Sequence, residues 1–125
     1  MTTIKESGEN YLETIYVLSQ ERKKVRSVDI ASALNFSKPS VSIAMKKLRQ
    51  KGYIETDQDG FIVLTESGNA IAESMYERHM FLSNWLISLG VDRQTSIDDA
   101  CKMEHVLSSQ SFEAIRASIE MKGLI

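Results

Sequence analysis

Three potential metal ligands lie within five residues of one another, in the pattern Cys101-x-x-Glu104-His105. On a helix, positions i, i+3 and i+4 share one face, so these three side chains can converge on one point. A thiolate, a carboxylate and an imidazole together suit a borderline transition ion such as Fe²⁺, Zn²⁺, Co²⁺ or Mn²⁺. The pattern also has a structural interpretation, because a single cysteine packs as a small hydrophobe and Glu-His pairs are common on solvated helices. The residues alone slightly favour the structural interpretation.

Other potential ligands carry less information. His79 lies among apolar residues of a predicted helix, where a lone histidine is more often a hydrogen-bonded core residue. Asn10 and Glu13 can offer oxygen donors, although an exposed polar face is the simpler interpretation. His79 and His105 are the only histidines, and the sequence has no glycine-rich phosphate loop, nucleophile elbow or catalytic triad. With so few general-base candidates, we do not expect an enzyme.

The overall composition is that of a soluble globular protein. The 125 residues, 42% of them hydrophobic and 26% charged, suffice for one ordinary domain or two small ones. No apolar run approaches the length of a membrane span, and the N-terminus does not have the pattern of a signal peptide. The single cysteine excludes an internal disulfide and suits a reducing compartment. We therefore expect a cytoplasmic protein that does not contact a membrane.

Basic residues are concentrated in one segment, although the net charge of the chain is −2. Residues 1–65 contain ten Lys and Arg against eight Asp and Glu, whereas residues 66–125 contain five against nine. The segment between Ile30 and Ile54 has five bases and no acid: Lys38, Lys46, Lys47, Arg49 and Lys51. A positive segment attached to an acidic remainder is typical of a phosphate-facing module, although a solvated helix face carries the same charges.

Apolar spacing and capping residues predict three helices in the first half of the chain. The first covers residues 9–20, and the second begins with Ser27 as its N-cap. A third begins near Ser37, with Pro39 in its first turn, where the missing N–H costs nothing. Gly52 ends this third helix.

A hairpin and three more helices are predicted for the rest of the chain. Two β-prone runs within residues 53–64 flank an Asp-Gly turn, which is a strong hairpin signal. A long helix follows its N-cap Thr65, another follows a cap at Ser96, and the last covers residues 109–121. The long helix and the segments after it carry more apolar surface than one small domain needs, which predicts pairing with a second copy. The residues concerned are Met75, Met80, Phe81, Trp85, Leu86 and Ile87.

Helix, short helix, tight turn, basic helix and hairpin, in that order, are typical of a winged helix-turn-helix. The sequence thus predicts a mainly α fold with a small β-hairpin. A winged helix-turn-helix DNA-binding domain is expected over residues 1–66 and a second, helical domain over 67–125. The third helix is expected to enter the major groove, which admits an α-helix. Its predicted DNA-facing residues are Ser37, Lys38, Pro39, Ser40, Ser42, Ile43, Lys46 and Lys47.

These side chains suit distinct contacts with double-stranded DNA. The hydroxyl groups can bond bases or phosphates, Pro39 and Ile43 can touch thymine methyl groups, and the lysines can neutralise phosphates. A small helical domain with a hairpin can also bind protein, or nothing. The acid-free helix and its small polar residues make that alternative weaker without removing it.

Taken together, these motifs resemble the diphtheria toxin repressor family, the bacterial iron- and manganese-dependent transcriptional repressors. The resemblance covers about residues 9–115, and the string Cys101-x-x-Glu104-His105-Val-Leu-Ser108 is its most specific part. The other matching pieces are Tyr11-Leu-Glu-Thr-Ile-Tyr16, Asp29-Ile-Ala, Ser37-x-Pro39-Ser40-Val41-Ser42, Leu64-Thr-x-x-Gly68 and Arg78-His79.

The resemblance implies a metal-responsive repressor that binds a palindromic DNA operator as a homodimer, and it favours the metal interpretation of the cysteine motif. Fe²⁺ or Mn²⁺ is the implied cofactor, with Zn²⁺ as a further candidate. In the family, the metal joins the first helix to the helices of the metal-binding and dimerisation domain. By position, Cys101, Glu104 and His105 match the main ligand cluster. Asn10 falls where relatives have methionine or aspartate, and Glu13 and His79 match ligands of manganese-type members.

This sequence also departs from the family pattern. Ser83 and Ile97 stand where iron-type members have ancillary ligands, so that second site is expected to be incomplete. Cys101 replaces the glutamate of manganese-type members, and Asn10 is a weaker donor than a carboxylate. Because the sequence stops at Ile125, we expect a short, two-part member without the extra C-terminal β-domain. The alternative is a winged-helix regulator controlled by a partner protein or by oxidation of Cys101, without metal.

Overall fold

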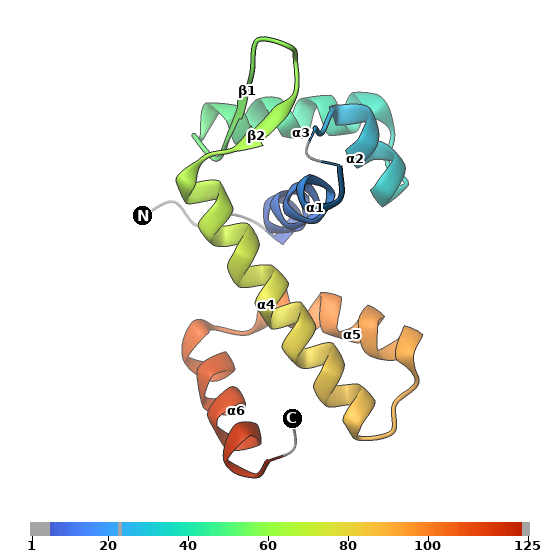
Figure 1. The fold of residues 1–125 in the computed structure, drawn as a ribbon, viewed down its shortest axis with the longest axis vertical. Coiled ribbons are helices and arrows are strands. Elements are labelled where there is room, and N and C mark those ends of the chain that lie inside the picture. Colours follow the sequence, from blue (N-terminus) through green and yellow to red (C-terminus); the bar gives the residue numbers. More distant parts are fainter. Residues whose placement is uncertain (1–5, 23, 124–125) are drawn as a thin grey trace. The chain divides into compact units, whose positions relative to one another are not determined.

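The computed structural model describes residues 6–22 and 24–123, and within them the chain forms two compact units, 1–74 and 75–125. Figure 1 shows the elements in chain order. They are α1 (Glu6–Arg22), α2 (Ser27–Leu34), α3 (Lys38–Gln50), β1 (Ile54–Thr56), β2 (Ile62–Leu64), α4 (Glu66–Ser88), α5 (Arg93–Val106) and α6 (Ser109–Met121). The mainly α fold with a small hairpin is therefore confirmed. Helix α4 contributes to both units, and the domain boundary after residue 66 stays a prediction.

A helix-turn-helix forms the centre of the first unit. Helix α2 ends at Leu34, and its C-cap Asn35 has a φ of 57°, the left-handed conformation that asparagine tolerates. Helix α3 begins at Lys38, and the Ser37 hydroxyl caps it by accepting the backbone N–H of Ser40 at 3.3 Å. Pro39 lies in the first turn, as predicted, where no intrahelical donor is lost.

The predicted cap of α2 is wrong by one residue. Ser27 is the first residue of the helix, and Arg26 occupies the N-cap position with extended backbone. The N–H of Arg26 donates to Asp29 Oδ2 at 2.9 Å, so an acid in the first turn stabilises the helix start instead of the serine hydroxyl.

The predicted cap of α5 is also wrong, because the helix begins at Arg93 rather than after Ser96. The Asp92 carboxylate accepts the N–H of Thr95 at 3.0 Å and its hydroxyl at 2.8 Å. These bonds, the backbone one first, hold the pKa of Asp92 below its usual value. The cap is therefore fully formed above the ordinary aspartate pKa and is lost as pH falls through the lowered value. Ser96 is buried, and its hydroxyl donates to the carbonyl of Val91 at 3.3 Å.

The wing is an antiparallel hairpin in which Ile54 pairs with Leu64 and Thr56 with Ile62. Its turn uses Gly60 at a φ of 84°, a conformation that favours glycine. The start of α4 packs closely against the base of the wing. A Cβ on Gly68 would lie 2.0 Å from the backbone oxygen of Tyr53, so only glycine fits there.

The apolar core of the first unit joins α1, the helix-turn-helix and the wing. Among its most buried members are Leu12, Ile15, Val25, Ile30, Val41, Met45, Ile54 and Ala72. These residues come from six elements or connections, so burying them fixes the orientation of α3 within the unit.

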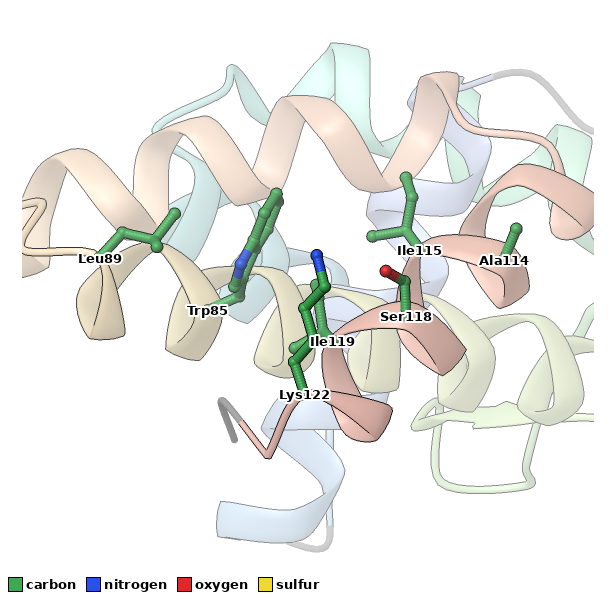
Figure 2. Close-up of a pocket in the computed structure, with 7 residues that line it drawn as sticks. All are labelled: Trp85, Leu89, Ala114, Ile115, Ser118, Ile119 and Lys122. Carbon is green, nitrogen blue, oxygen red and sulfur yellow. The ribbon is translucent and has the colours of Figure 1, made fainter.

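The second unit contains the rest of α4 together with α5 and α6, around a small core of Leu82, Ala100 and Phe112. Met75 is buried, whereas Met80 and Ile87 are exposed. Between α4 and α6 lies an open groove of about 490 Å³ with mainly apolar side chains (Figure 2). It is lined by Trp85, Leu89, Ala114, Ile115, Ser118, Ile119 and Lys122. None of the helices described for residues 6–22 and 24–123 has the length and apolarity of a membrane span.

Candidate functional site

The first part of the candidate site is the exposed face of α3. All eight residues predicted to face DNA are exposed, including Ile43, which keeps 58% of its surface accessible although it is apolar. Val41, Met45 and Leu48 are buried on the opposite face. This 3.6-residue alternation anchors α3 in the core while small polar, apolar and basic side chains face outward.

The second part is the cluster of Cys101, Glu104 and His105 on α5. The sulfur of Cys101, a carboxylate oxygen of Glu104 and a ring nitrogen of His105 all lie within 4.8 Å of one another. Cys101 is half-buried with a free thiol, and the side chains of Glu104 and His105 are 0% and 2% exposed. The helix thus brings together the three residues that the sequence singled out.

The donor set and its spread fit a divalent transition metal. Two ligands of one ion, each about 2.0–2.3 Å from it, can lie at most roughly 4.6 Å apart. A spread of 4.8 Å therefore needs only small side-chain rotations before all three atoms reach one ion. Sulfur, oxygen and nitrogen together are the ligands of Fe²⁺ or Zn²⁺ more than of Ca²⁺ or Mg²⁺.

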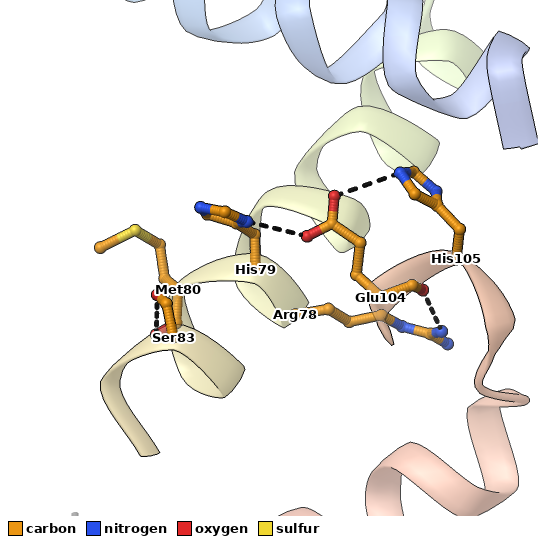
Figure 3. A network of polar contacts seen from close by, with 6 residues as sticks. All are labelled: Arg78, His79, Met80, Ser83, Glu104 and His105. Carbon is orange, nitrogen blue, oxygen red and sulfur yellow. Dashed lines mark hydrogen bonds and ion pairs between the residues drawn. The ribbon is translucent and has the colours of Figure 1, made fainter. Parts of the chain in front are cut away.

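Glu104 also contacts two imidazoles (Figure 3). Its Oε2 lies 3.1 Å from Nδ1 of His79 on α4, and its Oε1 lies 3.3 Å from Nε2 of His105. A buried carboxylate needs such polar partners. His79 is therefore linked to the cluster by its contact with Glu104. The spacing of residues along the sequence did not predict this contact.

Arg78, the neighbour of His79, ties the end of α5 to the rest of the unit. Its Nη1 donates to the backbone oxygens of Glu104 at 3.1 Å and Leu107 at 2.8 Å, and its Nη2 donates to the hydroxyl of Ser109 at 3.1 Å. The guanidinium carbon also lies 5.1 Å from the ring centre of Phe112. A buried cation is thus balanced by carbonyls at a helix C-terminus, and it fixes the backbone that carries Glu104 and His105.

Comparison with known proteins is consistent with both parts of the site. Residues 3–61 match the family described as iron dependent repressor, N-terminal DNA binding domain. Residues 65–121 match the iron dependent repressor metal binding and dimerisation domain. The chain is 34% identical over 115 residues to the transcriptional regulator MntR of Escherichia coli, covering 92% of this chain and 74% of MntR. The chain belongs to the iron-dependent repressor family.

Two further relatives are also transcriptional regulators. It is 36% identical over 109 residues to MntR of Bacillus pumilus, covering 87% of this chain and 76% of that protein. It is also 32% identical over 117 residues to an uncharacterised helix-turn-helix-type transcriptional regulator of Methanocaldococcus jannaschii, covering 92% and 94%. The iron-dependent repressors are metal-dependent transcriptional regulators and not enzymes, so the family resemblance and the non-enzymatic prediction are confirmed.

Solved structures of this repressor family have the same fold. The manganese regulator SloR superposes with a TM-score of 0.81 at 28% identity, over 95% of this chain and 55% of SloR. A manganese-dependent transcriptional repressor in complex with manganese gives 0.80 at 28% identity, over 90% and 52%. This chain therefore spans about half the length of these solved repressors.

Four further residues concern metal binding: Asn10 and Glu13, which were predicted as ligands, and Ser83 and Ile97, which were not. Asn10 and Glu13 lie on α1, in the first unit, and their participation in metal binding stays a prediction. Ser83 is buried, and its hydroxyl donates to the carbonyl of Met80 at 3.2 Å (Figure 3). Ile97 is half-buried on α5 and offers no donor. The incomplete ancillary site of this chain therefore stays a prediction.

Proposed function

We propose that this protein is a homodimeric repressor whose affinity for a palindromic DNA operator is raised by Fe²⁺ or Mn²⁺ held by Cys101, Glu104 and His105. The observation that carries the proposal is the convergence of sulfur, oxygen and nitrogen donors within 4.8 Å on α5. Membership of a metal-dependent repressor family supports the same function.

Binding of a cation to these donors depends on their protonation and on charge balance. Cys101 has to lose its proton to ligate, and His105 has to be neutral, so protons compete with the ion and metal affinity falls in acid. When bound, the ion supplies two positive charges and a cross-link between side chains. The Glu104 carboxylate, which already contacts His79 and His105, provides a buried negative charge to balance it.

The identity of the ion depends on Cys101. A thiolate is a softer ligand than the carboxylate it replaces in manganese-type relatives, and it shifts the preference from Mn²⁺ toward Fe²⁺ and Zn²⁺. We therefore expect this protein to bind Fe²⁺ at least as well as Mn²⁺.

Binding to DNA in this proposal combines two copies of α3. Each helix lies in a major groove and reads bases through Ser37, Pro39 and Ser40, while Lys46 and Lys47 contact phosphates. A two-fold symmetric dimer requires two half-sites separated by about one DNA turn, roughly 34 Å, or a multiple of it.

Selection of DNA from a random-sequence duplex pool tests this function directly. In the presence of Fe²⁺ without oxygen, or of Mn²⁺, the selected sequences are expected to be two-fold symmetric with the half-site spacing given above. With a chelator in place of the metal, enrichment is expected to fall. Selected sequences without symmetry, or enrichment that does not depend on any of Fe²⁺, Mn²⁺ and Zn²⁺, would contradict the proposal.

Arg78 is expected to act as a positioning residue for the metal. In Arg78→Met, the carbonyls of Glu104 and Leu107 lose this donor, so the folded protein is expected to bind Fe²⁺ or Co²⁺ about 10–100-fold more weakly, as when other supporting partners of ligands are removed. Isothermal titration measures this affinity, and thermal unfolding without metal measures stability. Ser109→Ala, which removes one bond to Arg78 and leaves both carbonyl contacts, is the matched control. If Arg78→Met and Arg78→Lys unfold more readily yet bind metal like the wild type, Arg78 is only structural.

A further inference from the structure

The segment between α1 and α2 forms the outer edge of the wing. Val25 pairs with Ile62 in an antiparallel bridge, and the N–H of Ile62 donates to the Val25 carbonyl at 2.7 Å. Since Ile62 also pairs with Thr56 of β1, β2 lies between β1 and this segment. Val25 is fully buried, and side chains alternate along an extended chain, so its neighbours Lys24 and Arg26 point together to the opposite, exposed side.

Both of these cations contact one aromatic ring. The Lys24 ammonium lies 5.2 Å and the Arg26 guanidinium carbon 4.6 Å from the ring centre of Phe61, which is half-buried and directly precedes β2. Cation–π attraction thus holds both side chains against the same ring. A phosphate that contacts this edge would meet two positive charges that are already held in place.

Two acids close to this segment along the chain or on the wing, Asp29 and Asp57, have other partners. Asp29 pairs with Arg22, with 3.1 Å between Oδ1 and Nη1. Asp57 uses its Oδ1 within the wing turn, where it accepts the N–H groups of Asp59 and Phe61, each at 2.9 Å. Among the described residues, no carboxylate forms an ion pair with Lys24 or Arg26. The pair of cations is therefore available to an external anion.

We propose that Lys24 and Arg26, held by Phe61, form a phosphate-binding site for the backbone of double-stranded DNA. The wing then contacts DNA through its outer edge, because its tip carries the acids Asp57 and Asp59 and would be repelled by phosphates. This inference rests on the proposed DNA binding and adds two residues that lie outside both α3 and the hairpin. A duplex is favoured over an acidic protein because the same unit carries the basic, exposed α3.

The test measures binding of the full chain to a fluorescent random-sequence duplex without added metal, over a series of salt concentrations. Each phosphate contact contributes about 0.9 to the slope of log affinity against log salt. Lys24→Gln/Arg26→Gln is therefore expected to reduce that slope by about 2. Phe61→Leu keeps both charges and is expected to weaken binding about two- to fivefold, the ratio that corresponds to an exposed cation–π contact.

Two controls separate a local contact from a general charge effect. Arg93→Gln/Lys102→Gln removes the same charge from exposed positions of α5 and is expected to leave the slope nearly unchanged. The proposed site is contradicted if Lys24→Gln/Arg26→Gln has the same salt slope as this control and Phe61→Leu binds the duplex like the wild type. Lys46→Ala/Lys47→Ala tells the two failures apart. If that variant has a lower salt slope, the proposed DNA binding through α3 still holds. If its slope is unchanged, that proposal fails too.

Discussion

Replacing His105 with alanine is expected to abolish the effect of metal on DNA binding while the fold survives. In the wild type, metal is expected to raise affinity for the selected DNA about 5–150-fold, the usual range of coupling between two ligands. His105 supplies one of the three donors on α5, and removing a residue that merely supports a ligand already costs about 10–100-fold in metal affinity. Losing a ligand itself should weaken metal binding at least as much. At ordinary metal concentrations, the increase in DNA affinity caused by metal is therefore expected to fall to about onefold.

The measurement is a titration of the selected duplex with protein, with and without Fe²⁺ or Mn²⁺, for the wild type, His105→Ala and Cys101→Ala. Coupling between two ligands is reciprocal. Saturating DNA is therefore expected to raise metal affinity by the same factor as metal raises DNA affinity. Co²⁺ provides an independent readout, because a cobalt–thiolate bond absorbs strongly in the near ultraviolet. This absorption should disappear in Cys101→Ala.

Lys102→Ala is the matched control, since Lys102 is an exposed residue of α5 between the proposed ligands. It is expected to keep the full metal effect, and far-ultraviolet circular dichroism checks that all variants are folded. If His105→Ala responds to metal like the wild type, the cysteine motif is structural in this protein. Regulation by a partner or by oxidation of Cys101 then becomes the better hypothesis.

The parts of the fold that the sequence predicted well are those set by neighbours along the chain. The apolar spacing of α3, with Val41, Met45 and Leu48 inward, depends only on helical geometry, and the hairpin depends on a local turn. The starts of α2 and α5 were predicted wrongly because several capping residues compete. Asp92, Thr95 and Ser96 are all good helix-start residues, and the burial of Ser96 is a tertiary effect with no local signal.

The same distinction applies to the candidate site. Cys101, Glu104 and His105 lie on one helix, so their spacing alone predicts that they converge. The contacts of Arg78 join residues far apart along the chain, on α4, at the end of α5 and at the start of α6, and no periodicity encodes them. Its only sequence signal was its place in the family motif. Likewise, the alternation of Lys24, Val25 and Arg26 shows an edge only once Val25 is known to pair with Ile62.

Introducing a charge into the groove between α4 and α6 is expected to convert the dimer into monomers. The groove belongs to the region that matches a dimerisation domain, and the proposed occupant is the same region of a second copy. Its apolar side chains include Leu89, which is 58% exposed in the single chain, and Ile115 (Figure 2). A second copy that covers these residues gains from removing apolar surface from water.

Leu89→Asp/Ile115→Asp places carboxylates where that surface would be buried. Desolvating a charged group costs several kcal/mol, and about 1.4 kcal/mol corresponds to a tenfold change in affinity. The dimer dissociation constant is therefore expected to rise by roughly a thousandfold. Light scattering and sedimentation at micromolar protein, with and without metal, measure the change in mass.

Loss of the dimer should also affect affinity for a palindromic duplex and affinity for a single half-site differently. A dimer binds a two-fold site with both copies of α3, and linking two binding modules typically raises affinity about 10²–10⁴-fold. The variant is thus expected to lose most of its affinity for the palindromic duplex while binding an isolated half-site as the wild-type monomer would.

Val106→Asp, a change at an apolar residue that is 74% exposed outside the groove, is the control and should stay dimeric. If the groove variant remains a dimer, the second copy binds another face. If the wild type is itself monomeric with metal and DNA present, the homodimer proposal fails.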